Sequence, residues 1–400
     1  MINIIDKPNC CGCHACYNRC PQKCISMQSD DEGFWYPVVD RKECIDCGLC
    51  EKVCPTLSKS IVENHPAAYA CLNKDDKIRQ QSSSGGVFTI VAASVLANHG
   101  VVFGAGFDRD FNVLHSSVDN LDGLSNLRGS KYVQSSIGDT YEQAKDFLKQ
   151  GRQVLFSGTP CQIAGLKSYL GKDYEGLICL DIICHGVPSP LVWKQYRSKL
   201  KNNNELKSIS FRDKTFGWKR FSLRLTYKND DEYTKDLNSD EFMQGFLKNV
   251  YLRPSCYHCS FKTLARQSDI TLADFWGIEN ILPSLDDDKG TSLILVNSDK
   301  GKEIFLAAAA KMEYKKIDID QAIVYNSAAI KSVAYNPKRD KFFRDLPETA
   351  DIIQLIAKYT KVSFPRKVYR KVRLLLSRIK RKILYLWMEQ TKSKGQSIKQ

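Results

Sequence analysis

The chain has 400 residues, of which 43% are hydrophobic and 26% charged, and this composition is typical of a globular protein of two or three domains. Its net charge of +14 comes almost entirely from residues 361–400, which hold thirteen basic residues and one acidic residue. Basic character is therefore a property of the tail and not of the body, so a nucleic-acid-binding function would depend on the tail alone.

No stretch approaches the roughly 20 apolar residues needed to cross a bilayer, so we expect no membrane-spanning segment. Sixteen cysteines would indicate disulfides in a secreted protein. The first residues, MINIID, lack the basic and apolar regions of a signal peptide. The cysteines also recur at the spacings of metal ligands. We therefore expect a cytoplasmic protein whose thiolates bind metal.

Two copies of one motif come first in the chain. Residues 10–21 read CCGCHACYNRCP, and residues 44–55 read CIDCGLCEKVCP. Each matches the signature of bacterial ferredoxins with two 4Fe–4S clusters, in which the fourth cysteine of each motif binds the other cluster. The spacing therefore predicts one cluster on Cys10, Cys13, Cys16 and Cys54, and a second on Cys44, Cys47, Cys50 and Cys20.

Other uses of these cysteines fit the pattern less well. A disulfide framework does not explain two copies of one spacing, and zinc sites usually combine two separated CxxC pairs. Cys11 and Cys24 lie outside the pattern, and we expect them to be spectators. Between the motifs, a turn signal at residues 30–33 with β-favouring residues on both sides predicts a short hairpin.

From about residue 65 to residue 360, short β-rich runs alternate with helical runs. This alternation predicts a mixed or partly parallel α/β sheet. Helices are expected at residues 85–98, 160–170 and 190–200, and from about residue 302. Strands are expected at residues 100–107, 153–156, 177–183, 208–211, 221–227 and 292–296.

Three segments of this region could hold an electron acceptor. Residues 82–86 read SSSGG before a helix, which suits a phosphate but is also an ordinary helix cap. Residues 157–161 form a polar loop directly after an apolar strand, where α/β proteins place ligands. Residues 129–132 offer a cation and an aromatic ring, although a surface loop would look the same.

Four further cysteines lie in loops and at strand ends of the same region. They could bind a third 4Fe–4S cluster, bind zinc together with His185 or His258, or be unrelated structural thiols. Cys71 and Cys179 fall in β-rich runs and are expected to be buried apolar thiols. The four cysteines in question are Cys161, Cys184, Cys256 and Cys259.

Taken together, these blocks resemble the coenzyme F420 hydrogenase/dehydrogenase β-subunit family over about residues 1–300. The resemblance implies a flavoprotein that passes electrons between clusters, FAD and an organic substrate, with a donor or acceptor protein as partner. It also favours the third cluster. The matching blocks are the two CxxCxxCxxxCP motifs, SSSGG, GSKYVQ, SGTPCQIAGL, CHGVPSP, the CxxC at 256–259, and SDITLADFWG. The residues that it implies near the flavin are Ser83, Ser84, Gly85, Gly86, Lys131, Tyr132, Ser157, Gly158 and Thr159.

These observations predict a flavin-based oxidoreductase that carries iron–sulfur clusters. His185 is a candidate proton donor, although a loop histidine is more often a structural hydrogen-bond partner. The alternative is a non-enzymatic electron-transfer subunit that docks to a partner oxidoreductase. The ferredoxin head and the basic tail look like the branch of the family found beside bacterial polysaccharide-synthesis enzymes.

In the tail, apolar residues recur at steps of three and four with Lys and Arg between them. This pattern predicts a basic amphipathic helix, suited to an anionic membrane surface at the inner face, or else a solvated helix or one that binds a partner; no nucleic acid is expected. The predicted fold is thus α+β: a two-cluster ferredoxin module at 1–60, a mixed α/β flavin and iron–sulfur domain at 61–360, and the tail at 361–400.

Overall fold

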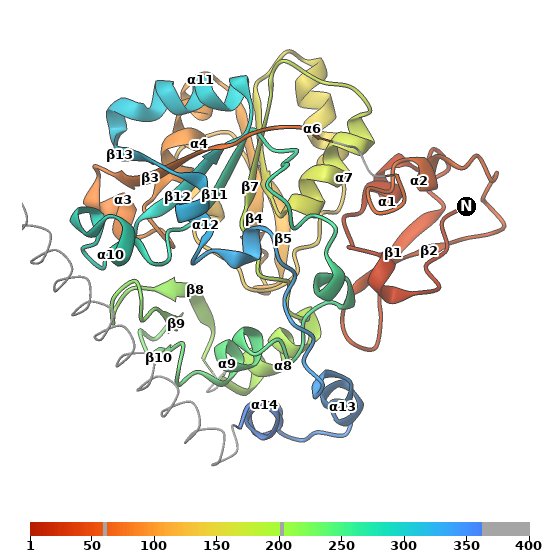
Figure 1. Ribbon diagram of the computed structural model, residues 1–400. Coiled ribbons are helices and arrows are strands. Elements are labelled where there is room, and N and C mark those ends of the chain that lie inside the picture. The colour runs from red at the N-terminus through yellow and green to blue at the C-terminus, as the bar shows by residue number, and fades with distance from the viewer. Residues whose placement is uncertain (59–61, 201–203, 362–400) are drawn as a thin grey trace, which may run out of the picture.

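The computed structural model describes residues 1–58, 62–200 and 204–361. Apart from Lys361, the predicted basic amphipathic helix lies outside the described residues. The described residues form three β-sheets of two, three and eight strands. Figure 1 shows the two-stranded sheet in an N-terminal module at one side, the eight-stranded sheet in the centre, and the three-stranded sheet below it. Among the described residues, no helix combines the length and the apolar character that crossing a bilayer requires.

The N-terminal module is built around the predicted hairpin. Its two strands pair antiparallel, with Ile25 opposite Val39, and the turn is held by Asp30, whose Oδ1 accepts from the backbone N–H of Phe34 at 2.8 Å. Gly33 in this turn has a φ of +85°, which an L side chain rarely adopts. The elements of the module are η1 (Lys7–Asn9), α1 (Ala15–Arg19), β1 (Ile25–Ser29), β2 (Trp35–Val39) and α2 (Leu49–Lys52).

The buried cluster of this module is rich in cysteine. It contains only two aliphatic residues, Ile2 and Ile25, and five cysteines. A domain of this size buries too little apolar surface to be stable without a metal or a covalent link. The module therefore depends on whatever its thiols bind, and on its packing against the rest of the chain.

The eight-stranded sheet has the order β13-β3-β12-β11-β7-β6-β4-β5. Strands β4, β6, β7 and β11 run parallel to one another, and the outer pairs are antiparallel. The mixed sheet that the alternation of strands and helices predicts is confirmed. The strands are β3 (Ala67–Asn73), β4 (Val101–Phe107), β5 (Val113–Val118), β6 (Val154–Gly158), β7 (Leu177–Ile182), β11 (Ile270–Asp274), β12 (Ser292–Val296) and β13 (Met312–Ile317).

Helices cover both faces of this sheet because successive strand residues point to opposite sides. Val102 of β4 packs with α4 and α11 on one face, whereas Val101 and Phe103 pack with α6 and α7 on the other. The helices around the sheet are α3 (Asp76–Gln80), α4 (Val87–Ala97), α5 (Leu124–Leu127), α6 (Thr140–Lys149), α7 (Pro160–Leu170), α10 (Ile278–Ile281), α11 (Asp299–Ala308) and α12 (Ile319–Ile323).

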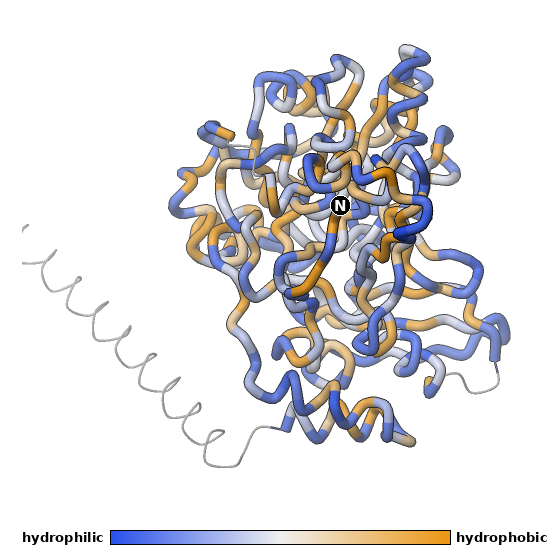
Figure 2. The backbone as a smooth tube through the Cα atoms, turned by 90° about the vertical axis from the view of Figure 1, so that its right-hand side faces the viewer, coloured by the Kyte–Doolittle hydropathy of each residue, from blue (hydrophilic) through white to orange (hydrophobic). Residues whose placement is uncertain are grey.

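The carboxyl ends of the four parallel strands meet at one edge of the sheet, which faces the layer below (Figure 1). That layer combines the antiparallel sheet β10-β9-β8 with short helices around an aromatic core that includes Trp193, Phe211 and Phe242. Figure 2 shows apolar backbone segments inside the molecule and hydrophilic turns outside. The elements of this layer are β8 (Leu206–Asp213), β9 (Ser222–Tyr227), β10 (Glu232–Asp236), α8 (Pro190–Leu200), α9 (Glu241–Leu247), α13 (Arg339–Asp345) and α14 (Ile352–Thr360).

The predicted helices and strands of the central region are present, with small shifts at their ends. Helix 160–170 has the predicted bounds, and strand 221–227 begins one residue later than predicted. The helix predicted from about residue 302 is α11, which begins at Asp299. It begins earlier because the Ser298 hydroxyl caps it by accepting from the N–H of Gly301 at 3.0 Å. The sequence did not predict β3, β5, β10, β11 or β13.

Candidate functional site

The first three cysteines of the first motif and the last cysteine of the second motif lie together inside the N-terminal module. We call Cys10, Cys13, Cys16 and Cys54 the inner thiol group; all four are buried. Burial raises the pKa of the Cys16 thiol, and the neighbouring thiols of Cys10 and Cys54 raise it further. Burial likewise raises the pKa of Cys10, whose thiol also interacts with that of Cys54. The structure thus brings Cys54 to the first motif.

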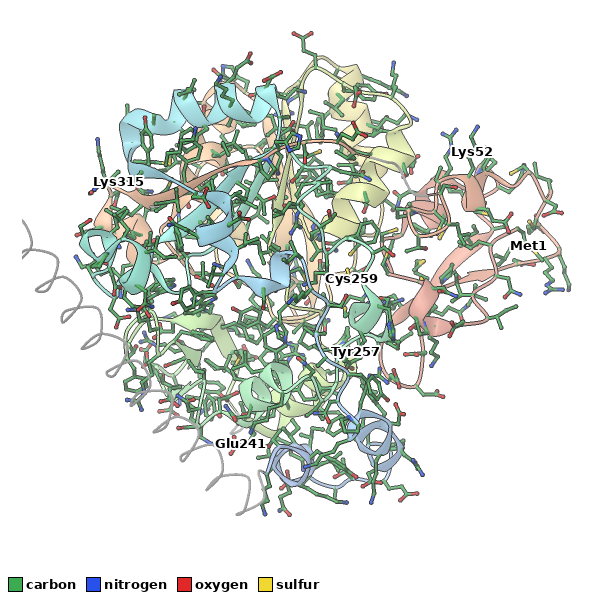
Figure 3. The ribbon with its side chains drawn as sticks, in the orientation of Figure 1. Met1, Lys52, Glu241, Tyr257, Cys259 and Lys315 are labelled. Atoms are coloured by element: carbon green, nitrogen blue, oxygen red, sulfur yellow. The ribbon has the colours of Figure 1, made fainter. Side chains whose placement is uncertain are left out.

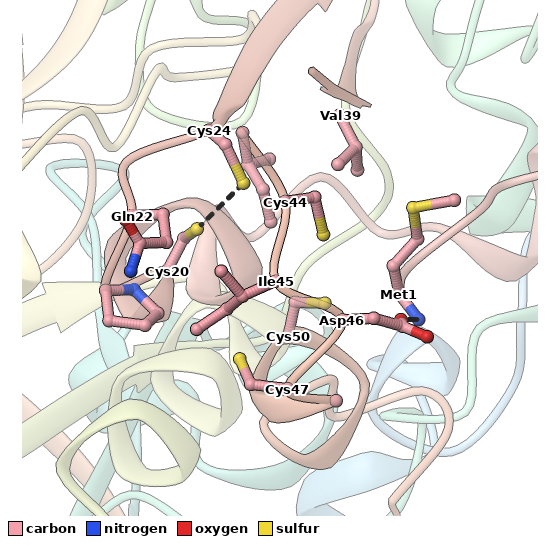
Figure 4. A pocket seen from close by; sticks show the side chains of 13 residues that line it. Met1, Cys20, Gln22, Cys24, Val39, Cys44, Ile45, Asp46, Cys47 and Cys50 are labelled. Atoms are coloured by element: carbon pink, nitrogen blue, oxygen red, sulfur yellow. Dashed lines mark hydrogen bonds and ion pairs between the residues drawn. The ribbon is translucent and has the colours of Figure 1, made fainter. Parts of the chain in front are cut away.

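The remaining four predicted ligands of the module line one pocket, shown in Figure 4. We call Cys20, Cys44, Cys47 and Cys50 the outer thiol group, because Cys47 is exposed and Cys44 is only half-buried. Cys24 lies in the same pocket, with its Sγ 3.4 Å from that of Cys20. Helix α1 ends at Cys20, so the chain turns there and carries this thiol away from the inner group.

Backbone N–H groups point at these sulfurs. The N–H of Ile2 donates to Cys50 Sγ at 3.2 Å. Burial raises the pKa of Cys10, Cys13 and Cys16, and the backbone N–H groups of Gly12, Ala15 and Tyr17, respectively, act in the opposite direction. Such bonds favour thiolates, and they are the bonds that tune iron–sulfur centres. The donor set and its surroundings therefore fit two four-iron clusters.

The structure also gathers the four cysteines that are distant from one another in the sequence. Cys161 lies in the first turn of α7, Cys184 follows β7, and Cys256 and Cys259 lie on and just after η2 (Pro254–His258). We call these four cysteines the third thiol group. Burial raises the pKa of Cys256, and the thiols of Cys184, Cys161 and Cys259 raise it further, so all four are neighbours. Figure 3 labels Cys259 on the side of the sheet that faces the N-terminal module.

The third thiol group is held by hydrogen bonds to its sulfurs. The N–H of Val187 donates to Cys256 Sγ at 3.5 Å, and the Thr159 hydroxyl lies 3.1 Å from Cys161 Sγ. Within residues 1–58, 62–200 and 204–361, no three histidine, cysteine or acidic side chains are close enough to hold a single metal ion.

His185 is held in place as a structural hydrogen-bond partner. Its Nε2 lies 2.7 Å from Asn249 Oδ1, and its ring packs edge-on against Phe246, with 5.0 Å between the ring centroids. Burial lowers the pKa of this imidazole. Asn249 thus occupies one of the two ring nitrogens of His185.

The two cysteines predicted to be spectators both contact predicted ligands. Cys24 contacts Cys20. The pKa of the Cys11 thiol is raised by interaction with the Cys13 thiol, and the Cys11 thiol in turn raises the pKa of Cys161, so Cys11 lies between the inner and the third thiol groups. Close packing explains this contact, because a Cβ on a glycine of α7 would lie only 3.0 Å from Cys13 Sγ. Sequence spacing contains no signal for Cys11, since its partner lies 150 residues away.

The SSSGG segment predicted to lie near a flavin makes its hydrogen bonds within the protein. The Ser83 hydroxyl accepts from the N–H of Ser130 at 2.7 Å, and the Ser84 hydroxyl donates to the carbonyl of Thr291 at 2.9 Å. The N–H of Gly85 donates to a serine hydroxyl of β12 at 2.9 Å. Gly86, with a φ of +82°, begins α4. These groups bind protein atoms and do not form an open phosphate cradle.

The other residues of the predicted flavin set lie near the edge of the sheet. Lys131 Nζ donates to two backbone carbonyls, at 3.0 and 3.1 Å, and burial lowers the pKa of this ammonium group to about 7. The Tyr132 hydroxyl accepts from Arg212 Nη1 at 3.1 Å. The Ser157 hydroxyl donates to the carbonyl of Phe103 at 3.1 Å. Gly158 ends β6, and Thr159 caps α7.

In the arrangement that the structure describes, the polar groups of this set make hydrogen bonds within the protein. None of the residues of the set lines either the outer-thiol pocket or a second pocket beside Arg266. The structure thus gives a grouped donor set for the clusters, and a flavin site on these residues stays a prediction. For this reason, we derive no chemical step through a flavin.

A buried ion pair that the sequence did not predict lies beside this set. Both Arg212 Nη atoms donate to Asp274, at 2.6 and 3.0 Å, and Trp218 Nε1 donates to the same carboxylate at 2.9 Å. Asp274 belongs to the SDITLADFWG block and ends β11. An arginine and an aspartate that are 62 residues apart give no local sequence signal of their pairing.

His115 joins the two loops of the predicted flavin set. Its Nδ1 lies 2.7 Å from Ser135 Oγ and its Nε2 3.0 Å from the carbonyl of Ser157. Burial lowers the pKa of His115 from 6.5 to about 4. Between these two pH values the unfolded chain binds a proton that the native protein does not, so native stability decreases as the pH falls through this window.

We therefore expect the melting temperature to fall between pH 7 and pH 5, and to fall less in a His115→Gln variant. The contribution of one such histidine is up to about 1.4 kcal/mol per pH unit. Thermal unfolding followed by circular dichroism at both pH values measures the difference. Equal losses in wild type and variant would show that another group is responsible.

Two comparisons with protein families identify parts of the chain. Residues 9–57 match the family described as "4Fe-4S dicluster domain". This segment is a 4Fe–4S dicluster domain. Residues 151–322 match the family that represents the C-terminal part of the beta subunit of coenzyme F420 hydrogenase/dehydrogenase. The protein is thus an iron–sulfur electron-transfer protein related to this β subunit.

No curated protein matches the chain. One chain in a xenon-derivatised structure of the F420-reducing [NiFe] hydrogenase complex from Methanosarcina barkeri is 16% identical, with a TM-score of 0.43. The alignment covers 74% of the present chain and 91% of that chain.

Proposed function

We propose that electrons cross this protein through three four-iron clusters, bound in order by the outer, inner and third thiol groups. When bound, such clusters exchange single electrons. The contact of the Cys11 thiol with both Cys13 and Cys161 carries the proposal, since it joins the dicluster domain to the thiols of the large sheet. The exposure of Cys47 supports the outer group as the one that faces a partner protein.

The chain itself positions and shields the thiols. Backbone N–H groups donate to sulfurs of the inner and third groups and so favour their thiolate form. Burial of the inner group excludes water from the middle of the route. Packing of α7 against Cys13 fixes the distance between the inner and third groups, on which electron transfer depends.

The family resemblance adds FAD and an organic substrate to this proposal. Its polysaccharide-associated branch suggests a surface-glycan intermediate as the substrate. Both additions rest on the resemblance, and the flavin content of the purified protein tests the first of them. Turnover of a glycan intermediate by the isolated chain tests the second.

A non-enzymatic electron-transfer subunit is the second candidate function. The observation that favours it is that Ser83, Ser84 and Gly85 make hydrogen bonds within the protein, so that this segment offers no open site for a cofactor phosphate. In this case the third thiol group would deliver electrons to a partner oxidoreductase. Clusters without flavin in the isolated chain are the expected result.

Iron analysis of anaerobically purified protein tests the proposed route. We expect about twelve iron atoms per chain for three four-iron clusters. A Cys161→Ser variant should lose about four of them and keep the reducible signals of the dicluster domain in electron paramagnetic resonance. A Cys71→Ala variant, which changes a buried thiol outside the three groups, should keep all of them.

Other iron contents would contradict the route. About eight iron atoms in both the wild type and the Cys161→Ser variant would remove the third cluster from it. Protein without iron or acid-labile sulfide would contradict the proposed function as a whole.

A further inference from the structure

Arg253 lies at the junction of the dicluster domain and the large sheet. Its side chain is fully buried, at 0% exposure. Nε donates to the carbonyl of Cys10 at 2.9 Å, Nη1 to Gln134 Oε1 at 3.2 Å, and Nη2 to the carbonyl of Trp35 at 3.0 Å. The guanidinium also lies 4.2 Å from the ring centroid of Tyr36. All these partners are uncharged groups.

The other deeply buried arginines of the described ranges have carboxylate partners. Among the ion pairs of residues 1–58, 62–200 and 204–361, none includes Arg253. Within these ranges, Arg253 is thus the fully buried guanidinium without an acidic partner. The pairs that the other buried arginines form are Arg79–Asp287, Arg212–Asp274, Arg266–Asp181 and Arg339–Glu32.

A buried cation without a counter-charge is strongly unfavourable. The groups around Arg253 that can carry negative charge are thiols and one phenol. Cys10, Cys11 and Cys256 raise the pKa of its guanidinium, and they come from the inner group, the bridging position and the third group. Thiolates that bind a cluster would supply the missing charge. A cluster gains further negative charge when it is reduced.

We propose that Arg253 is the counter-ion of the inner cluster and raises its reduction potential above that of the outer cluster. The inference rests on the proposed function, because it needs the inner cluster to be present. Net charge and hydrogen bonds around the thiolates set the potential of such clusters. Since Arg253 contacts the Cys10 segment and none of the outer thiol group, we expect its effect to be larger at the inner cluster than at the outer one. The higher reduction potential of the inner cluster favours electron transfer from the outer cluster to the inner one.

Gln134→Glu is the most informative variant, because it changes the charge without changing the size of the side chain. It places a carboxylate beside the guanidinium, 3.2 Å from Nη1 in the native geometry. We expect a tenfold shift of the inner cluster toward the oxidised form at fixed potential, which is about 59 mV for one electron. Arg253→Gln should shift the reduction potential of the inner cluster in the same direction, and Arg253→Lys should keep most of the native potential. A redox titration of whole protein, followed by electron paramagnetic resonance, measures each.

Arg339→Gln is the matched control. Arg339 is also buried and also holds the dicluster domain, through Glu32, but it has that carboxylate as its partner. We expect the reduction steps of the Arg339→Gln protein to match those of the wild type. If Arg253→Gln does not fold, Gln134→Glu and Arg253→Lys still decide the question.

The outcomes separate this inference from the proposed function. Unchanged potentials in Gln134→Glu, in protein that holds all its clusters, would overturn the role of Arg253 alone. Equal shifts of the inner and outer reduction steps would also overturn it. Wild-type protein without reducible clusters would instead overturn the proposed function.

Discussion

A Cys20→Ser variant is expected to lose the outer cluster, although Cys20 belongs to the first motif in the sequence. Its thiol lies in the pocket of Cys44, Cys47 and Cys50, and not with the inner thiol group. Without this fourth ligand, we expect about four fewer iron atoms per chain and the loss of one reducible signal. Iron analysis and electron paramagnetic resonance of anaerobic protein measure both.

Cys24→Ser is the control for this variant, because the Cys24 sulfur lies only 3.4 Å from that of Cys20. Cys24 is outside the motif, so the variant should keep its full iron content. If Cys24→Ser loses the cluster and Cys20→Ser keeps it, the assignment of the fourth ligand is wrong. If Cys20→Ser loses the inner cluster, each motif binds its own cluster, and the exchange of fourth ligands is wrong.

An Asp274→Asn variant is expected to reduce the free energy of unfolding by roughly 3–5 kcal/mol, the usual effect of removing one partner of a buried ion pair. The side chain of Arg212 is only 3% exposed, and both its Nη atoms bond to this carboxylate. The amide of asparagine still accepts from Trp218, but it leaves the guanidinium without a counter-charge. Chemical denaturation of whole protein, followed by circular dichroism, measures the loss.

Asp286→Asn provides a matched control in the same part of the protein. Asp286 pairs at 2.6 Å with Lys219, whose side chain is 38% exposed. Water screens a pair of this kind, so its removal should cost about 1 kcal/mol or less. If both variants lose the same free energy of unfolding, burial does not make the Arg212–Asp274 pair more stabilising than an exposed pair.

The sequence predicted part of the local structure, including helices α4, α7, α8 and α11, because local structure depends on near neighbours. The bounds of α7 follow from Thr159 as the cap and from Pro160 at the first helical position, and its end follows from Gly171 in the left-handed region. The hairpin of the dicluster domain follows from Asp30 and Gly33 in the turn. Edge strands such as β13 were missed, because their burial pattern gives no clear alternation.

The sequence by itself determined that a dicluster domain is present and predicted its ligands, since three cysteines spaced two apart on one tight loop can reach a single cluster. Only the tertiary structure decided what surrounds them. Cys11 meets Cys161 across 150 residues, and Arg253 reaches the carbonyl of Cys10 across 243. The physical reason is range: a loop fixes its own thiols by covalent geometry, whereas these contacts exist only once the dicluster domain packs against the large sheet.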